Sequence, residues 1–275
     1  MGTLRLILAM SVVLGHGAGY MSLIPFSGNA AVYCFFVISG FYMSLILNEK
    51  YLGAGAAWRF YTNRILRLFP TYLVVLPVVA SYRGFAHPEQ FHFLVDSSIS
   101  LLNRGLVVIA NLTTIGIDHY RYSYEQMRLP NIDDWRLIPQ AWSLEPELIF
   151  YAIAPFVLRR LNVCKALVFL GVAVTLFVNQ RQIEANGSWF LLSKYLAFFA
   201  AGPVCYLWYK RMPARMSAQS MAITLGLGAI VLTASYLYRL DLVDDPIAWP
   251  YLPLYAATAI LVPHAFLPGD HQQQD

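Results

Sequence analysis

Charged side chains are scarce in this sequence. Asp, Glu, Lys and Arg make up 12% of the 275 residues, whereas 58% are hydrophobic. The hydrophobic residues form recurrent long runs in place of the amphipathic stripes of a soluble core. The low charge therefore predicts a polytopic membrane protein surrounded by a lipid bilayer. The net charge of +4 is small, and the basic residues cluster between apolar runs, so the sequence does not indicate binding of nucleic acid.

Cysteine is scarce as well. Cys34, Cys164 and Cys205 lie in or beside apolar segments, and no CxxC pair is present. An odd, scattered set predicts neither a disulfide framework nor a metal site. No cleavable signal peptide is evident, because the first apolar run lacks a basic stretch ahead of it beyond Arg5 and lacks a clear small-residue cleavage site. We therefore expect this run to be the first membrane span.

Eight apolar runs are candidates for membrane-crossing helices. A crossing of the hydrocarbon core takes about 20 apolar residues. The candidate runs are residues 5–23, 30–47, 66–82, 142–158, 165–179, 188–208, 218–238 and 247–266. The sequence thus predicts an all-α fold, a polytopic membrane helix bundle with about eight spans. We expect one domain, residues 1–268, followed by a polar tail, residues 269–275.

Basic residues gather in three clusters, at residues 50–67, 159–165 and 210–215. All three clusters lie on one side of the membrane if residues 91–140 make no net crossing. Loops rich in Lys and Arg face the cytoplasm. This pattern predicts a multi-pass membrane protein with both termini in the cytoplasm.

The segment between the third and fourth runs is the ambiguous part of this topology. Residues 91–116 carry Asp96, Asn103 and Arg104, so a re-entrant or interfacial segment fits better than a full crossing. If the segment does cross, the orientation of everything downstream inverts. Residues 117–140 form the longest polar stretch, which is either a binding loop for an acceptor or a solvated connector.

The stretch of residues 4–20, LRLILAMSVVLGHGAGY, places an ionisable group inside a span. Arg5 and His16 are eleven residues apart, which puts them on nearly the same helix face, three turns or roughly 16 Å apart. Arg5 would then lie at the water boundary and His16 deep in the bilayer. A histidine at that depth is a candidate functional residue, and the alternative is a structural hydrogen bond to a neighbouring helix.

Two further patterns contain residues suited to chemistry. Arg64 and Arg67 lie three residues apart, on one face of a helix that enters the membrane, and two guanidinium groups side by side suit phosphate recognition. The alternative is anchoring to anionic lipid headgroups.

Another pattern, VYCFFVISGFYMS at residues 32–44, contains no charged residue. It places Ser39 and Gly40 where a neighbouring backbone could approach closely.

Glu147 lies one turn into the apolar run that begins near residue 142, with Ser143 at i−4 and Tyr151 at i+4 on its own face. A carboxylate at such a position needs a partner or becomes neutral. Either state serves proton transfer, and His16 is a candidate partner. The alternative is that Ser143 or Glu145 starts a helix, for which Pro146 suits the first turn.

Taken together, the order and spacing of these patterns resemble acyltransferase family 3, membrane-bound O-acyltransferases that modify sugars and glycan chains. The resemblance covers roughly residues 4–210. It is carried by Arg5-x10-His16, FFVISGF at residues 35–41, Phe60-x3-Arg64-x2-Arg67-x2-Pro70-x-Tyr72, Trp142-Ser143-Leu144-x2-Glu147-x2-Phe150-Tyr151 and Phe199-x2-Gly202.

The resemblance implies transfer of an acyl group, commonly acetyl, from acyl-CoA (acetyl-CoA) to a hydroxyl of a carbohydrate or glycan acceptor. It implies no metal. On this basis Arg64 and Arg67 are expected to bind the phosphates of the donor, and Arg5 to stabilise charge near the donor entrance. His16 is expected to act as the general base, oriented by Glu147. The expected supporting residues are Ser39, Tyr72, Trp142, Ser143 and Tyr151, and direct transfer and an acyl-enzyme on His16 or Ser143 both remain open.

The chain departs from the family in length. Family members usually continue through about two more spans, so this chain is apparently short at the C-terminus. The alternatives are a naturally compact member, a truncated gene product and an inactive family member, and we expect a homodimer or a partner chain to fill any gap that missing helices leave. A rival class is a proton-coupled transporter or flippase-like protein, in which His16, Glu147 and the arginines would line a proton and anion path.

Overall fold

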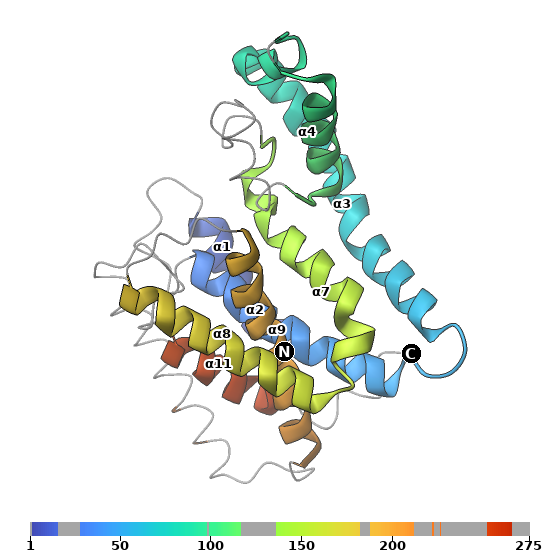
Figure 1. Cartoon of the computed structure of the whole chain (residues 1–275). Coiled ribbons are helices and arrows are strands. Elements are labelled where there is room, and N and C mark those ends of the chain that lie inside the picture. Colours follow the sequence, from blue (N-terminus) through green and yellow to red (C-terminus); the bar gives the residue numbers. More distant parts are fainter. Residues whose placement is uncertain are drawn as a thin grey trace. The chain divides into compact units, whose positions relative to one another are not determined.

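The computed structural model describes residues 2–15, 28–97, 99–116, 136–181, 188–211 and 252–265, with residues 222 and 226 as isolated positions. The elements in these ranges are all helical, which confirms the predicted all-α class for the described residues. They are α1 (Gly2–Gly15), α2 (Gly28–Glu49), α3 (Ala56–Ala86), the 3-10 helix η2 (Pro88–Leu94), α4 (Leu101–Thr113), the 3-10 helix η3 (Pro139–Ser143), α7 (Leu144–Val157), α8 (Leu161–Arg181), α9 (Ser188–Arg211) and α11 (Leu252–Ala265) (Figure 1).

The number of spans is not confirmed by these helices. Among the described residues, two helices are long and apolar enough to cross a membrane, Ala31–Glu49 and Ala56–Ala86. The predicted run at 66–82 is the second part of the 31-residue helix α3. The run at 142–158 is a 14-residue α-helix preceded by a 3-10 turn. Most of the run at 218–238 and all of the tail at 269–275 lie outside the described residues.

The ambiguous segment 91–116 forms two short helices, η2 and α4. The 13 residues of α4 rise roughly 20 Å, less than the hydrocarbon core of about 30 Å. Ser100 caps α4 by accepting a hydrogen bond from the backbone N–H of Asn103, at 3.2 Å. The Arg104 guanidinium donates to the carbonyl oxygens of Leu94, Asp96 and Ile99, at 2.9, 2.7 and 3.0 Å. Helix α4 alone is therefore too short to cross the core, and the re-entrant or interfacial placement of this segment stays a prediction.

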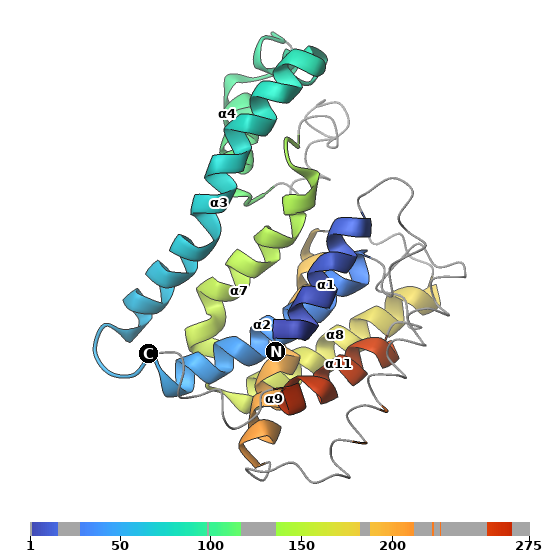
Figure 2. The same cartoon turned by 180° about the vertical axis from the view of Figure 1, so that it is seen from behind.

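The described residues gather into two compact units. The first unit contains residues 1–50, 156–184 and 193–275, and the second contains residues 51–155 and 185–192. In the first unit, α1 and α11 both pack against α2 (Figures 1 and 2). Helix α2 is therefore the centre of that unit, as its large share of buried side chains indicates.

Helices α2 and α9 cross with their backbones in contact. A Cβ atom added to Gly40 would lie 2.0 Å from the carbonyl oxygen of Phe199, and one added to Gly202 would lie 2.0 Å from the backbone nitrogen of Phe41. No real Cβ atom approaches so closely, so both positions require glycine. The expectation that Gly40 admits a neighbouring backbone is confirmed, and its partner is the segment around Gly202.

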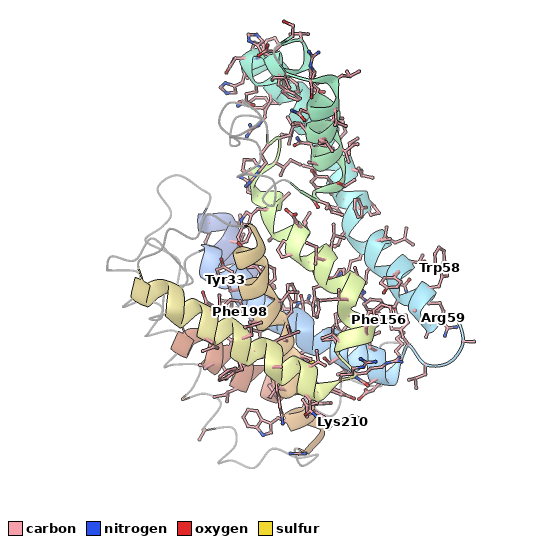
Figure 3. All side chains as sticks on the ribbon, viewed as in Figure 1. Tyr33, Trp58, Arg59, Phe156, Phe198 and Lys210 are labelled. Atoms are coloured by element: carbon pink, nitrogen blue, oxygen red, sulfur yellow. The ribbon has the colours of Figure 1, made fainter. Side chains whose placement is uncertain are left out.

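Aromatic rings fill the space beside this crossing. Tyr33 of α2 lies 5.0 Å from the ring of Phe198 and 5.8 Å from that of Tyr255, measured between ring centroids (Figure 3). Phe36 stacks on Phe199 with 4.5 Å between centroids. Offset and edge-on pairs at these separations add to the energy of burying the rings. Helices α2, α9 and α11 are thus joined by one aromatic cluster.

The cysteines belong to the packed interior of the first unit. Cys34, Cys164 and Cys205 are buried and free of disulfides. Cys34 Sγ and Thr258 Oγ1 are 3.3 Å apart and share a hydrogen bond between α2 and α11. These thiols therefore act as small core side chains.

In the second unit, α3 and α7 lie side by side (Figures 1 and 2). The Tyr61 hydroxyl on α3 donates to the carbonyl oxygen of Ala152 on α7, at 2.9 Å. Helix α3 starts after Gly55, whose φ of 72° would be strained for a residue with a side chain. Large apolar side chains cover the outer surface of α3, and these are Trp58, Ile65, Leu66, Leu73, Val74, Val75, Val78, Tyr82 and Phe85. Such a surface suits contact with lipid.

Candidate active site

Arg64 is a buried cation on α3. Arg64 is 7% exposed to solvent. Its guanidinium carbon lies 5.8 Å from the centre of the Phe60 ring and 6.0 Å from that of the Tyr151 ring. A guanidinium beside two aromatic rings is attracted to their electron-rich faces. Phe60 lies four residues before Arg64, one helical turn away, while Tyr151 comes from α7. The two helices together hold the cation.

Glu147 and Tyr151 form a hydrogen-bonded pair on α7. The Tyr151 hydroxyl donates to Glu147 Oε1. Tyr151 is 4% exposed, and Glu147 is half-buried. The predicted shared face of these two residues is confirmed, because an i to i+4 spacing brings side chains together on a helix. The carboxylate is therefore oriented by the phenol that also faces Arg64.

Two arginines of α3 contribute positive charge near the Glu147–Tyr151 pair. Both Arg64 and Arg67 interact electrostatically with the Tyr151 hydroxyl, as Glu147 does. The second unit thus brings together four of the predicted residues: Arg64, Arg67, Glu147 and Tyr151. Arg64 lies beside the Tyr151 ring and Glu147 is bonded to its hydroxyl, while Arg67 acts on it through its charge alone. Such an arrangement can hold an anionic group on one side and move a proton on the other.

The two arginines differ in exposure. Arg64 is buried, whereas Arg67 is exposed. Three residues along an α-helix correspond to a rotation of about 300°, which leaves two side chains roughly 60° apart around the axis. That angle turns Arg64 toward the rings and Arg67 toward the outside. The expected pair of equivalent phosphate ligands is therefore one buried and one accessible guanidinium.

The other predicted residues have separate places. Tyr72 on α3 donates its hydroxyl to the carbonyl oxygen of Asn111 on α4. Trp142 and Ser143 lie half-buried in η3, directly before α7. Arg5 on α1 and Ser39 on α2 are half-buried within the first unit. His16 lies outside the described residues, as do residues 117–135 of the long polar stretch.

Glu145 has a larger structural role than its sequence position predicts. Glu145 is 5% exposed to solvent, and its Oε1 accepts a hydrogen bond of 2.8 Å from the backbone N–H of Gly116. Sequence reasoning offered a helix-start role, and α7 does begin at Leu144 with Glu145, Pro146 and Glu147 in its first turn. Acidic side chains there are stabilised by the positive end of the helix dipole. The carboxylate also joins the end of α4 to the start of α7.

Sequence reasoning missed Asn111, and it named Phe60 in a pattern without giving it a role. Asn111 Oδ1 accepts from the backbone N–H of Leu137, at 2.9 Å, and its Nδ2 donates to the carbonyl of Val107, at 3.0 Å. Asn111 is a buried amide among apolar residues of α4, and buried amides are generally satisfied by hydrogen bonds. An aromatic residue one turn before Arg64 was the available signal for Phe60.

Comparison with known proteins adds one finding to this geometry. The sequence profile of the family described as an acyltransferase domain matches residues 2–272. No curated protein and no solved structure matches the chain. The profile covers nearly all of the sequence, including every residue of the cluster around Tyr151.

Proposed function

Because the chain belongs to acyltransferase family 3, we propose that it transfers an acyl group, acetyl by family expectation, from acyl-CoA to a hydroxyl of a carbohydrate or glycan acceptor. The family and the apolar helices indicate a membrane acyltransferase. We further propose the donor, the acyl chain, the acceptor and a location in the inner cell membrane. The observation that carries the proposal is the cluster of Arg64, Arg67, Glu147 and Tyr151.

Arg67 is the proposed phosphate ligand for the donor. Its guanidinium is exposed on α3, so a hydrophilic phosphate can reach it without displacing protein contacts. Planar guanidinium groups bind phosphate oxygens through paired hydrogen bonds. Arg64 takes a different role, because its guanidinium is buried beside Phe60 and Tyr151. We assign Arg64 to the electrostatic support of the Tyr151–Glu147 pair.

The chemistry proposed for the transfer requires a base. His16 removes the proton from the acceptor hydroxyl as the hydroxyl oxygen attacks the thioester carbonyl carbon. The carbon–sulfur bond breaks, and the departing thiolate takes up the proton as the free thiol. Glu147, held by Tyr151, stabilises the charge that forms on the base. The assignment of His16 comes from the sequence, since this residue lies outside the described part of the chain.

The first experiment uses the detergent-purified 275-residue protein with radiolabelled acetyl-CoA. Wild type is compared with His16→Ala and Arg67→Ala, and Arg59→Ala serves as the matched control because Arg59 is an exposed arginine of the same helix. Release or transfer of label that needs His16 and Arg67 but not Arg59 supports the proposal. Turnover that is intact in His16→Ala contradicts the assignment of the base.

Binding of the donor has a separate test. A ligand that binds the folded state at a hundred times its dissociation constant stabilises that state by about 2.7 kcal/mol. Acetyl-CoA should therefore raise the thermal midpoint of the wild-type protein, and less so that of Arg67→Ala. A protein that only carries glycans across the membrane would show no such rise with acetyl-CoA.

A further inference from the structure

One end of the first unit carries a concentration of basic side chains. Helix α2 ends at Glu49, α9 ends at Arg211, and α8 begins at Leu161. The basic residues around these three helix ends come from three separate stretches of the sequence, and they are Lys50, Arg159, Arg160, Lys165, Lys210 and Arg211. We call this set the basic end. Each of its six residues is exposed.

Direct contacts between side chains and α2 show that the separate stretches meet at the end of that helix. The Arg159 guanidinium donates to the carbonyl oxygen of Leu47, at 3.2 Å. Lys210 Nζ lies 2.6 Å from Glu49 Oε1 (Figure 3 labels Lys210). Arg159, two residues before α8, and Lys210 in the last turn of α9 are therefore both bonded to the final turn of α2. The basic end is one surface of one unit.

The negative charge at this surface is already compensated. Glu49 is the one carboxylate of the described residues at the basic end, and it accepts hydrogen bonds from Lys210 and from the Tyr206 hydroxyl, the latter at 3.1 Å. The other five cations of the basic end remain as additional positive charge, including Arg159, which donates to a neutral carbonyl. Positive charge near the negative ends of the α2 and α9 dipoles is favourable. Stabilising two helix ends does not by itself account for six cations on one surface.

Aromatic residues place the surface at a boundary between lipid and water. Trp208 of α9 is 41% exposed, and Tyr209 packs edge-on against Phe41 with 5.8 Å between ring centroids. Exposed amphipathic rings favour the headgroup level of a membrane. Arg211 and Lys210 follow them directly in the chain. The long cationic side chains thus start at the depth where lipid phosphates lie.

We propose that the basic end binds the headgroup of an anionic phospholipid such as phosphatidylglycerol. The phosphodiester supplies the negative charge, while its acyl chains lie along the apolar helices. A soluble phosphate compound offers the same charge but gains nothing from the apolar surface beside it. A basic side chain near an anionic membrane surface contributes about 1 kcal/mol of attraction, so loss of two should weaken lipid binding on the order of 10-fold to 30-fold.

The test titrates phosphatidylglycerol into delipidated protein in detergent. Retained lipid is counted by native mass spectrometry, and the thermal midpoint is measured alongside. The test variant is the double substitution Arg160→Gln with Arg211→Gln, which spares the Lys210–Glu49 pair. The control variant is Arg59→Gln with Arg83→Gln, which removes the same charge from exposed or half-buried arginines of α3. Phosphatidylcholine, inorganic phosphate and coenzyme A are titrated in parallel.

The expected result is retention of phosphatidylglycerol by wild type and by the control variant, with the stated loss in the test variant. Phosphatidylcholine should be retained weakly and equally by all three proteins. Equal retention of phosphatidylglycerol by wild type and test variant overturns the proposal, and so does an equal loss in the control variant. A coenzyme A response that disappears in the test variant also overturns it, because the surface would then serve a soluble phosphate compound.

Discussion

Two helix pairs of this protein are joined in opposite ways. In the first unit, α2 and α9 meet backbone to backbone at Gly40 and Gly202. In the second unit, α3 and α7 meet through side chains, with the Arg64 guanidinium beside the Tyr151 ring and the Tyr151 hydroxyl bound to Glu147. The first contact is defined by shape and admits no added atom. The second is defined by charge and hydrogen bonding, so its residues can take part in chemistry.

The largest effect is expected at the glycine crossing. Gly40→Val places side-chain atoms within the space of the Phe199 backbone, and a backbone cannot move aside as a flexible side chain can. We expect a loss of stability of more than about 3 kcal/mol, the upper end for overpacked cores, seen as a lower thermal midpoint of the purified protein.

Gly105 is the matched control for that substitution. It lies within α4, and a Cβ atom added there meets no other atom within 4 Å. Gly105→Ala should therefore be neutral or stabilise the protein by about 0.4–1 kcal/mol. If Gly40→Ala is tolerated as well as Gly105→Ala, the two helices are not in backbone contact.

The next effect is expected at the charged pair. Glu147→Gln keeps the shape of the side chain but removes its charge, and loss of a positioned acid or base costs on the order of 10²-fold in turnover. Tyr151→Phe keeps the ring beside Arg64 and removes only the hydrogen bond to Glu147, so a smaller loss is expected. The measurement is the turnover number with acetyl-CoA, with the thermal midpoint as a check on folding. A larger loss in Tyr151→Phe than in Glu147→Gln would give Tyr151 the direct role.

The two arginines should separate binding from turnover. Arg67→Ala should raise KM for acetyl-CoA by roughly 10-fold to 100-fold, since a charge-assisted hydrogen bond contributes about 1.5–3 kcal/mol, with little change in kcat. Arg64→Ala should mainly lower kcat, because Arg64 acts through Tyr151. Steady-state kinetics of both variants provide the comparison, and Arg64→Lys tests whether charge alone restores activity. Identical kinetic changes in both alanine variants would contradict the distinction.

The smallest effect is expected at the Glu49–Lys210 pair. Its hydrogen bond to Glu49 raises the pKa of Lys210 above the ordinary value for lysine. A raised pKa in the folded state means that the stabilisation is fully present below the ordinary lysine pKa and is lost as pH rises through the raised pKa. Because Lys210 is exposed, Glu49→Gln should cost only about 0.2–1 kcal/mol. The thermal midpoints of wild type and Glu49→Gln should therefore converge at strongly alkaline pH, whereas a constant difference would point to packing at Glu49.

The parts of this arrangement that sequence reasoning predicted are local. The contact of Glu147 with Tyr151 follows from a four-residue spacing on one helix, and the close approach at Gly40 follows from the absence of a side chain. The partner of Gly40 could not be predicted, because the spacing within α2 carries no information about Gly202 on α9. The contrast between Arg64 and Arg67 depends on how α3 is rotated against α7, which one helix alone does not determine. The hydrogen bond from Gly116 to Glu145 joins the end of α4 to the start of α7, so it too could not be predicted from one helix alone.

The length of α3 has a mechanical consequence. Its 31 residues rise roughly 46 Å, about 16 Å more than the hydrocarbon core of a bilayer. The helix must therefore tilt or extend beyond the core, and Arg64 and Arg67 lie within its first four turns. Hydrophobic mismatch acts on such a helix at a modest cost for each ångström. Bilayer thickness then sets how far the accessible guanidinium of Arg67 stands above the lipid, so the protein in short-chain and long-chain lipids would present the proposed donor site at different heights.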